Sequence, residues 1–138
     1  MNNFPIIADT GVIVGLINKK DQWHEWAFEQ SKELAPPFYT CESVITEACF
    51  LLHNLKNGEQ TVLGMVADGL LQLNFNLSAE TENIKNLMKK YADVPISLAD
   101  ACLVRMSELL DNSSVFTLDS DFHIYRKNGK QKIDLIIP

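Results

Sequence analysis

The sequence predicts an α/β fold, a three-layer α/β/α sandwich with a mainly parallel central sheet. Apolar runs suited to buried strands occupy residues 4–9 and 114–119, and a last strand is expected at 133–137. Segments with helical apolar spacing lie between them, and this alternation is typical of parallel sheets. The 138 residues are enough for one domain with a sizeable core, so we expect a single domain over residues 1–138.

The first third of the chain begins with the strand at 4–9, which ends at Asp9. Thr10 is a suitable N-cap for a helix over 11–18. A second helix is predicted over 23–34, and the prolines that follow it prevent its continuation.

The middle third contains a helix over 43–58, for which Gly58 serves as the predicted C-cap. Its buried stripe is formed by Val44, Ile45, Ala48, Leu51, Leu52 and Leu55. A short helix follows over 59–69. Apolar and polar residues then alternate over 70–77, which predicts a half-exposed strand at or near the sheet edge.

The last third begins with a helix over 78–94, starting at Ser78, with acids in its first turn and lysines near its end. A second helix over 97–112 has a predicted buried stripe of Ala99, Cys102, Leu103, Met106, Leu109 and Leu110. The dipeptide Asn128-Gly129 predicts a tight turn before the final strand.

Composition and charge exclude several classes of protein. The net charge of −6 argues against a general nucleic-acid binder, although local basic patches remain possible at Arg126, Lys127, Lys130 and Lys132 and at Lys19 and Lys20. The first residues lack the basic leader of a secretion signal, and no apolar run is long enough for a membrane span, so we expect a cytoplasmic protein. Three cysteines without a C-x-x-C pattern are interpreted as small buried residues, and three scattered histidines argue against zinc.

Four acids lie at the edges of predicted elements. Asp9 and Asp119 end two buried strands, and parallel strands would bring them to one edge of the sheet. Asp100 and Glu47 lie on the flanks of the apolar stripes of their helices, where a side chain can reach over a cleft.

Each acid also has an ordinary structural explanation. Asp9 and Asp119 could be turn or cap residues, and Glu47 could be a solvated helix residue. Asp100 follows Ser97 at the spacing of a capping box. If the four converge, however, their mutual repulsion favours a bound cation, and oxygen ligands without thiolates or imidazoles suit Mg²⁺ or Mn²⁺. Such a site points to phosphodiester chemistry.

Four motifs, in order, resemble the PIN-domain family, and more narrowly its toxin ribonucleases of toxin–antitoxin pairs. They are "IIADTGVIVGLI", "SVITEACFLL", "SLADACLV" and "TLDSDF". The resemblance covers essentially the whole chain. It implies a Mg²⁺- or Mn²⁺-dependent endoribonuclease that uses metal-activated water, is commonly a homodimer, and is inhibited by a small antitoxin whose chain end enters the acidic cleft.

The resemblance also implies roles for individual residues. Metal-ligand or catalytic roles fall on Asp9, Glu47, Asp100 and Asp119. Thr10 and Thr117 match small hydroxyl positions that hold ligands or waters. Ser97 caps the helix that presents Asp100, while Asp121 is expected to cap the segment after it or to hold a metal-bound water.

RNA binding at pI 4.9 would depend on the two basic groups and the metals. Trp23, Trp26 and Tyr125 are candidates for base stacking, against the alternative of core or dimer packing. Two other functions are alternatives to this assignment. A Mg²⁺-dependent α/β phosphatase would need D-x-D-x-T at the first strand, where this chain has "DTGVI". A non-catalytic PIN-like module that binds RNA or protein is disfavoured because all four acids are present.

Overall fold

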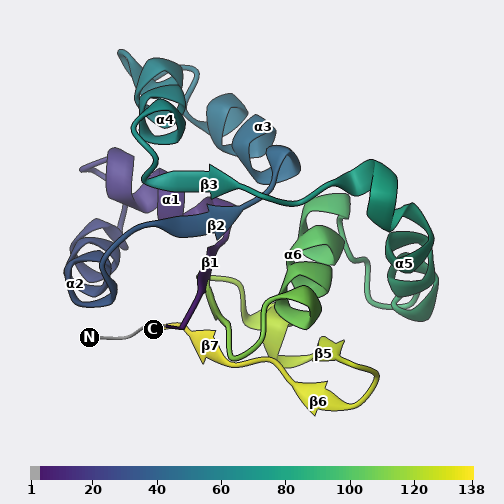
Figure 1. Cartoon of the computed structure of the whole chain (residues 1–138). Helices are drawn as coiled ribbons and strands as arrows, with labels where there is room; N and C mark the ends of the chain where they lie inside the picture. The colour runs from purple at the N-terminus through teal and green to yellow at the C-terminus, as the bar shows by residue number, and fades with distance from the viewer. Residues whose placement is uncertain (1–3) are drawn as a thin grey trace.

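A five-stranded sheet forms the centre of the computed structural model, which describes residues 4–138 (Figure 1). Its order is β3-β2-β1-β4-β7, and every neighbouring pair is parallel. The strands are β1 (Ile6–Ala8), β2 (Phe38–Thr40), β3 (Leu71–Leu73), β4 (Ser114–Phe116) and β7 (Leu135–Ile136). Because β1 and β4 are parallel neighbours, with Ala8 opposite Phe116, the segments that follow them emerge side by side.

Six α-helices within residues 4–138 flank this sheet, so the predicted layered α/β/α fold is confirmed. They are α1 (Thr10–Ile17), α2 (His24–Leu34), α3 (Glu42–Leu51), α4 (Gly58–Ala67), α5 (Leu77–Lys90) and α6 (Leu98–Leu109). Helices α1 and α2 lie on one side of the sheet and α5 and α6 on the other, while α3 contacts both α1 and α6 (Figure 1). No helix within residues 4–138 combines the length and apolar character needed to cross a bilayer.

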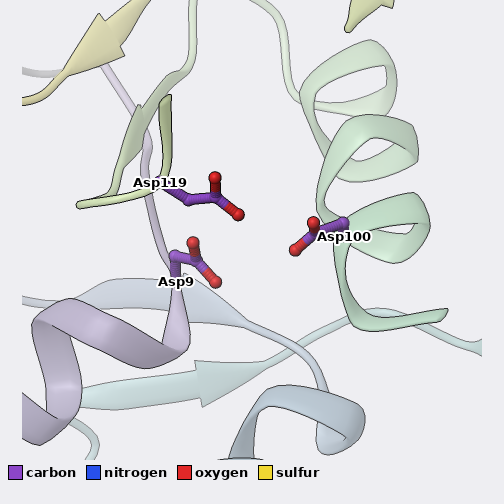
Figure 2. A group of neighbouring side chains, drawn as sticks. All are labelled: Asp9, Asp100 and Asp119. Atoms are coloured by element: carbon purple, nitrogen blue, oxygen red, sulfur yellow. The ribbon is translucent and has the colours of Figure 1, made fainter. Parts of the chain in front are cut away.

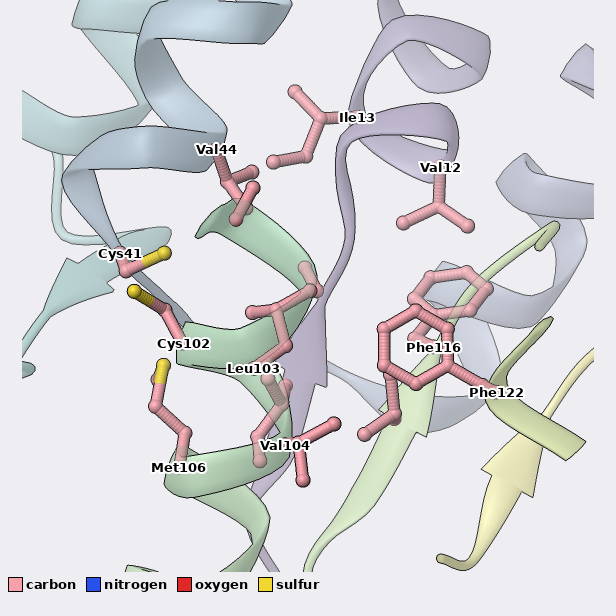
Figure 3. Close-up of a cluster of buried hydrophobic side chains, with 14 of the residues drawn as sticks. Val12, Ile13, Cys41, Val44, Cys102, Leu103, Val104, Met106, Phe116 and Phe122 are labelled. Carbon is pink, nitrogen blue, oxygen red and sulfur yellow. The ribbon is translucent and has the colours of Figure 1, made fainter. Parts of the chain in front are cut away.

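The buried core joins the sheet to both helical layers. Trp26 of α2 packs on Phe116 of β4, with ring centroids 5.6 Å apart. On α6, Leu103 and Met106 are almost fully buried and lie in the cluster drawn in Figure 3. The predicted role of the first residues as part of the fold is confirmed for β1, while residues 1–3 lie outside the described part of the chain.

A β-hairpin lies against the outside of α6. It consists of β5 (Arg126–Lys127) and β6 (Gln131–Lys132), after a short 3₁₀ helix η1 (Ser120–His123). Asn128 and Gly129 both have positive φ values, 51° and 85°, as the predicted Asn-Gly turn requires. Two contacts hold the turn: Lys90 Nζ donates to the Gly129 carbonyl at 2.9 Å, and the Asn128 N–H donates to Glu108 Oε2 at 2.6 Å.

The predicted helix over 43–58 is wrong in its second half, since α3 ends at Leu51. Asn57 has a left-handed backbone (φ 60°), which interrupts a helix, and Gly58 is the first residue of α4 rather than a C-cap. A Cβ at Gly58 would lie 2.3 Å from the Leu52 carbonyl oxygen, so this close approach explains the glycine. Leu51 and Leu55 are consequently exposed rather than part of a buried stripe.

The predicted strand over 70–77 is also too long. Only Leu71–Leu73 pair, at the sheet edge as predicted, because the Asn76 side chain accepts a hydrogen bond from the Ala79 N–H and starts α5. That helix therefore begins at Leu77 and not at Ser78.

Two smaller predictions need correction, and one strand has no counterpart in the sequence prediction. Asp9, not Thr10, is the N-cap of α1, because its side chain accepts from the Thr10 N–H. Leu109 of the predicted α6 stripe is 49% exposed. Strand β2 was not predicted at all, although the Thr40 hydroxyl donates to the Ala8 carbonyl at 2.8 Å within the core.

Candidate metal centre

Three carboxylates meet at the carboxyl edge of the sheet. Asp9 directly follows β1, Asp119 lies three residues beyond β4, and Asp100 is in the first turn of α6. One oxygen from each of the three lies within 4.8 Å of the others. Figure 2 shows these side chains projecting toward a common centre from three separate elements. The spacing is suitable for a single cation shared between all three.

Hydrogen bonds fix the two acids that come from the strands. Asp9 Oδ2 accepts from the Thr117 hydroxyl at 2.6 Å, and Asp9 Oδ1 accepts from the Thr10 N–H at 2.7 Å. Thr117 Oγ1 in turn accepts from the Asp119 N–H at 2.9 Å, so one buried hydroxyl ties both segments together. Asp119 Oδ1 accepts from the Asp121 N–H at 2.9 Å, which makes Asp119 the N-cap of η1.

The third acid is held from α6 and from the segment after η1. The Asp100 N–H donates to the Ser97 hydroxyl at 3.0 Å, so Ser97 caps α6 as predicted. Asp100 Oδ2 accepts from the Tyr125 hydroxyl at 3.2 Å. The Asp100 carboxylate therefore faces the other two acids with one oxygen oriented by a buried tyrosine.

Burial and mutual repulsion of these carboxylates favour either protonation of the cluster or binding of a cation. Burial raises the pKa of Asp9, and the charges of Asp119 and Glu47 raise it further, against the opposing hydrogen bonds from Thr117 and Thr10. Burial, followed by the charges of Asp9 and Asp119, raises the pKa of Asp100 to about 7. A bound divalent cation would relieve this repulsion and restore the charged forms.

The other residues predicted for the metal site differ in their burial and in their distance from the three aspartates. Glu47 is exposed on α3 and lines the same cleft of about 230 Å³ as the three aspartates, but it is outside their tight group. Thr10 also lines this cleft, and its buried Oγ1 has no hydrogen-bond partner within residues 4–138. Asp121 is half-buried and outside the group of three, where its backbone N–H supports Asp119.

The PIN domain family model matches residues 6–128, a stretch that contains all the acids of the cleft. The chain belongs to the PIN-domain family. The family predicted from the four sequence motifs is thereby confirmed. No curated protein matches the sequence significantly.

Among solved structures, this PIN domain is similar to the crystal structure of VapC20 from Mycobacterium tuberculosis, a toxin that cleaves the sarcin–ricin loop. The two chains are 20% identical, with a TM-score of 0.63. The match covers 84% of this chain and 91% of VapC20. At this identity the similarity supports the shared fold.

The predicted basic cluster lies on the hairpin of the PIN domain. Lys130 and Lys132 are exposed, whereas Arg126 and Lys127 are half-buried. The Arg126 guanidinium donates to three successive carbonyls, at 2.7, 3.1 and 3.0 Å, which are those of His123, Ile124 and Tyr125. Arg126 thus holds the turn after η1, and the two exposed lysines are the better candidates for phosphate contacts.

The three aromatic residues predicted as candidates for base stacking also differ in their exposure to solvent. Tyr125 is fully buried, so base stacking is wrong for it and core packing is correct. Trp26 is half-buried and packs on Phe116, in agreement with the packing alternative, and its stacking on bases stays a prediction. Trp23 is 38% exposed, and stacking there stays a prediction. Sequence reasoning missed the Tyr125 contact with Asp100, because nothing in the local pattern links two positions 25 residues apart.

A larger cavity of about 830 Å³ lies elsewhere, between α1, α2 and α4, and is lined mainly by apolar side chains. It shares no lining residue with the acidic cleft. This cavity is larger than the acidic cleft, but among the described residues no Asp or Glu lines it, whereas the three converging aspartates line the smaller cleft.

Proposed function

We propose that this PIN domain is a metal-dependent endoribonuclease and the toxin of a toxin–antitoxin pair. The observation that carries the proposal is the convergence of Asp9, Asp100 and Asp119 within 4.8 Å at the carboxyl edge of a parallel sheet. Without a cation this cluster destabilises the fold. A protein that keeps such a cluster at an open cleft is expected to use it.

The donor set fits Mg²⁺ or Mn²⁺, because every ligand offered is an oxygen. Asp9, Asp100 and Asp119 would hold the ion. The Thr10 hydroxyl, which has no hydrogen-bond partner in the described part of the chain, offers a further oxygen to a ligand or water. Glu47 would act from the rim of the cleft. When bound, such an ion supplies positive charge that eases ionisation of water and stabilises charge developing on a phosphodiester.

Neighbouring side chains of the protein hold the metal-binding aspartates in position. Thr117 holds Asp9 and the backbone at Asp119 in fixed relation, and Tyr125 orients one oxygen of Asp100. Asp121 would support Asp119 or hold a water beside it. Fixed ligands lower the cost of assembling a site in which water and phosphate lie in line.

RNA is the proposed substrate, and the exposed lysines of the hairpin are proposed to contact its phosphates. The activity of VapC20, which cleaves the sarcin–ricin loop, supports RNA as the substrate class. We further propose that the protein is cytoplasmic, forms a homodimer, and is held inactive by a small antitoxin.

Cleavage of RNA by the purified protein tests the enzyme proposal directly. We expect cleavage with Mn²⁺ or Mg²⁺, no cleavage in excess EDTA, and loss of cleavage in Asp9→Asn and Asp100→Asn. Asp93→Asn makes the same chemical change at an exposed position outside the cleft and should cleave normally. Cleavage that persists in EDTA or in either cleft variant would overturn the assignment.

The toxin proposal needs a separate test, since a ribonuclease need not be a toxin. Expression of the protein should arrest growth in a manner that depends on Asp9. Co-expression of a short neighbouring reading frame should restore growth. If the active enzyme leaves growth unaffected, the toxin role is wrong while the nuclease role stands.

A further inference from the structure

The C-terminal end of α5 and the β5–β6 hairpin bring cationic side chains together on one side of the protein. Lys90 Nζ donates to the Gly129 carbonyl at 2.9 Å, which places the end of α5 directly against the hairpin turn. No Asp or Glu occurs in residues 89–92 or 126–133. The chain has 12 lysines and arginines, and half of them lie in these two short segments: Lys89, Lys90, Arg126, Lys127, Lys130 and Lys132. In a protein with a net charge of −6, this local excess of positive charge would attract an anionic partner.

Four lysines of this surface are available to an anion. Lys89 and Lys90 are exposed on α5, as are Lys130 and Lys132 on the hairpin. None of the four makes an ion pair within residues 4–138. Lys90 uses one proton on the neutral Gly129 carbonyl, so its ammonium keeps two further protons for a phosphate oxygen.

A carboxylate of α6 holds the hairpin in place. Glu108 Oε2 accepts from the Asn128 N–H at 2.6 Å, and Glu108 Oε1 accepts from the Arg105 guanidinium at 3.1 Å. Arg105 Nε donates in turn to Glu80 Oε1 of α5 at 2.6 Å. The side chains of Glu108, Glu80 and Arg105 are only 13%, 17% and 22% exposed, so water screens these contacts less than it screens surface pairs. The hairpin turn is therefore tied to both α5 and α6.

The base of the hairpin is connected to the acidic cleft. The Arg126 N–H donates to the Tyr91 hydroxyl at 2.8 Å, and the Tyr91 ring packs edge-on against Tyr125, with centroids 5.2 Å apart. Tyr125 is the residue whose hydroxyl donates to Asp100. A phosphate chain bound along this surface can therefore extend toward the cleft, which favours RNA over an acidic protein as its occupant. Figure 1 shows the hairpin on the same side of the sheet as α5 and α6.

We propose that the end of α5 and the hairpin form one RNA-binding surface, in which Lys89 and Lys90 contact phosphates beside Lys130 and Lys132. Glu108 is a positioning residue that holds the hairpin half of this surface against α6. The inference rests on RNA being the substrate class of the proposed function. Because the contacts come from lysines, RNA is expected to bind this surface without a metal ion.

Fluorescence anisotropy tests the α5 half of the surface. A labelled single-stranded RNA is titrated with the full-length protein in excess EDTA over a range of salt concentrations. Replacing both Lys89 and Lys90 by glutamine should weaken binding about 25-fold at about 0.1 M salt and flatten the log–log slope by about 1.4, since each phosphate contact on a single strand contributes about 0.7. Lys89→Gln alone, which keeps the contact between Lys90 and Gly129, should give half of this change in slope. Lys32→Gln makes the same change at an exposed position of α2, on the other side of the sheet, and should alter neither value.

The same titration tests Glu108. Glu108→Ala leaves the Asn128 N–H without its acceptor and should weaken RNA binding by at least about fivefold, while Mn²⁺ affinity measured by calorimetry stays unchanged. Glu108→Gln keeps an oxygen for the Asn128 N–H and should restore most of the RNA affinity. A purely structural role would lower the melting temperature of Glu108→Ala but leave the RNA affinity of the folded protein unchanged.

Unchanged RNA affinity and salt slope after replacement of Lys89 and Lys90 would overturn the shared surface. Poly-glutamate that binds more tightly than RNA and displaces it would also overturn it, because the surface would then suit an acidic protein. Equal RNA affinity of wild type and folded Glu108→Ala would remove the positioning role. The proposed function fails separately: a protein that binds RNA through these lysines in EDTA but never cleaves it loses only the nuclease assignment. A protein that cleaves RNA while the lysine variants bind normally loses only this surface.

Discussion

Replacement of Asp100 by asparagine is expected to stabilise the metal-free protein while it abolishes metal-dependent activity. The pKa of Asp100 is raised from 3.8 to about 7 by burial and by the neighbouring carboxylates. The folded state therefore binds this proton more tightly than the unfolded chain does. Folding is favoured most by this group below about pH 4, and the advantage is lost as the pH rises toward 7.

The magnitude follows from that difference in pKa. A rise from 3.8 to about 7 corresponds to roughly 4 kcal/mol at about 1.36 kcal/mol per pKa unit. Because the Asp100 carboxyl is partly exposed, solvent screening reduces the cost to about 2 kcal/mol. Asparagine cannot ionise but keeps an oxygen that can accept from the Tyr125 hydroxyl, so Asp100→Asn should recover most of this cost at pH 8.

Thermal unfolding in EDTA, followed by circular dichroism at pH 5 and pH 8, measures the effect. At pH 8 we expect Asp100→Asn to melt roughly 6 to 10 °C above wild type, and at pH 5 the gap should fall to less than half of that. Asp93→Asn, an exposed control, should change neither value. Addition of millimolar Mn²⁺ should raise the melting temperature of wild type more than that of the variant, since only wild type keeps all three ligands. A variant that is no more stable than wild type at pH 8 in EDTA would refute the electrostatic reasoning.

Three further predictions concern the orientation of Asp100, the packing at Gly58 and RNA binding by the hairpin lysines. Tyr125→Phe should weaken Mn²⁺ binding by about tenfold in calorimetric titration, because Asp100 loses the hydrogen bond that orients it, and unchanged affinity would argue against this role. Gly58→Ala should lower the free energy of unfolding by about 2 kcal/mol or more in urea titration, because its Cβ would lie 2.3 Å from a backbone oxygen, while cleavage per folded molecule stays normal. Charge reversal of Lys130 and Lys132 together should weaken RNA binding and flatten its salt dependence by about 1.4 in log–log slope, and an unchanged slope would place the RNA elsewhere.

The convergence of two acids could be predicted from the sequence because a general rule connects them. Asp9 and Asp119 each follow an apolar run, and parallel strands bring their carboxyl ends to one edge. The structure places β1 beside β4 and joins the two acids through Thr117. Asp100 could also be placed, because Ser97 marks the start of its helix and the helical period then fixes its flank.

Other features depend on contacts that no local pattern encodes. Strand β2 has three residues, like β1 and β4, but it follows two prolines and lacks the longer apolar run that marks those strands, and only its pairing with β1 and β3 makes it a strand. The apolar stripe of α3 continued in the sequence beyond the point where the helix ends, since Gly58 serves a close approach that spacing cannot reveal. The distance of the Glu47 side chain from the three aspartates likewise depends on how α3 packs, which the local sequence does not encode.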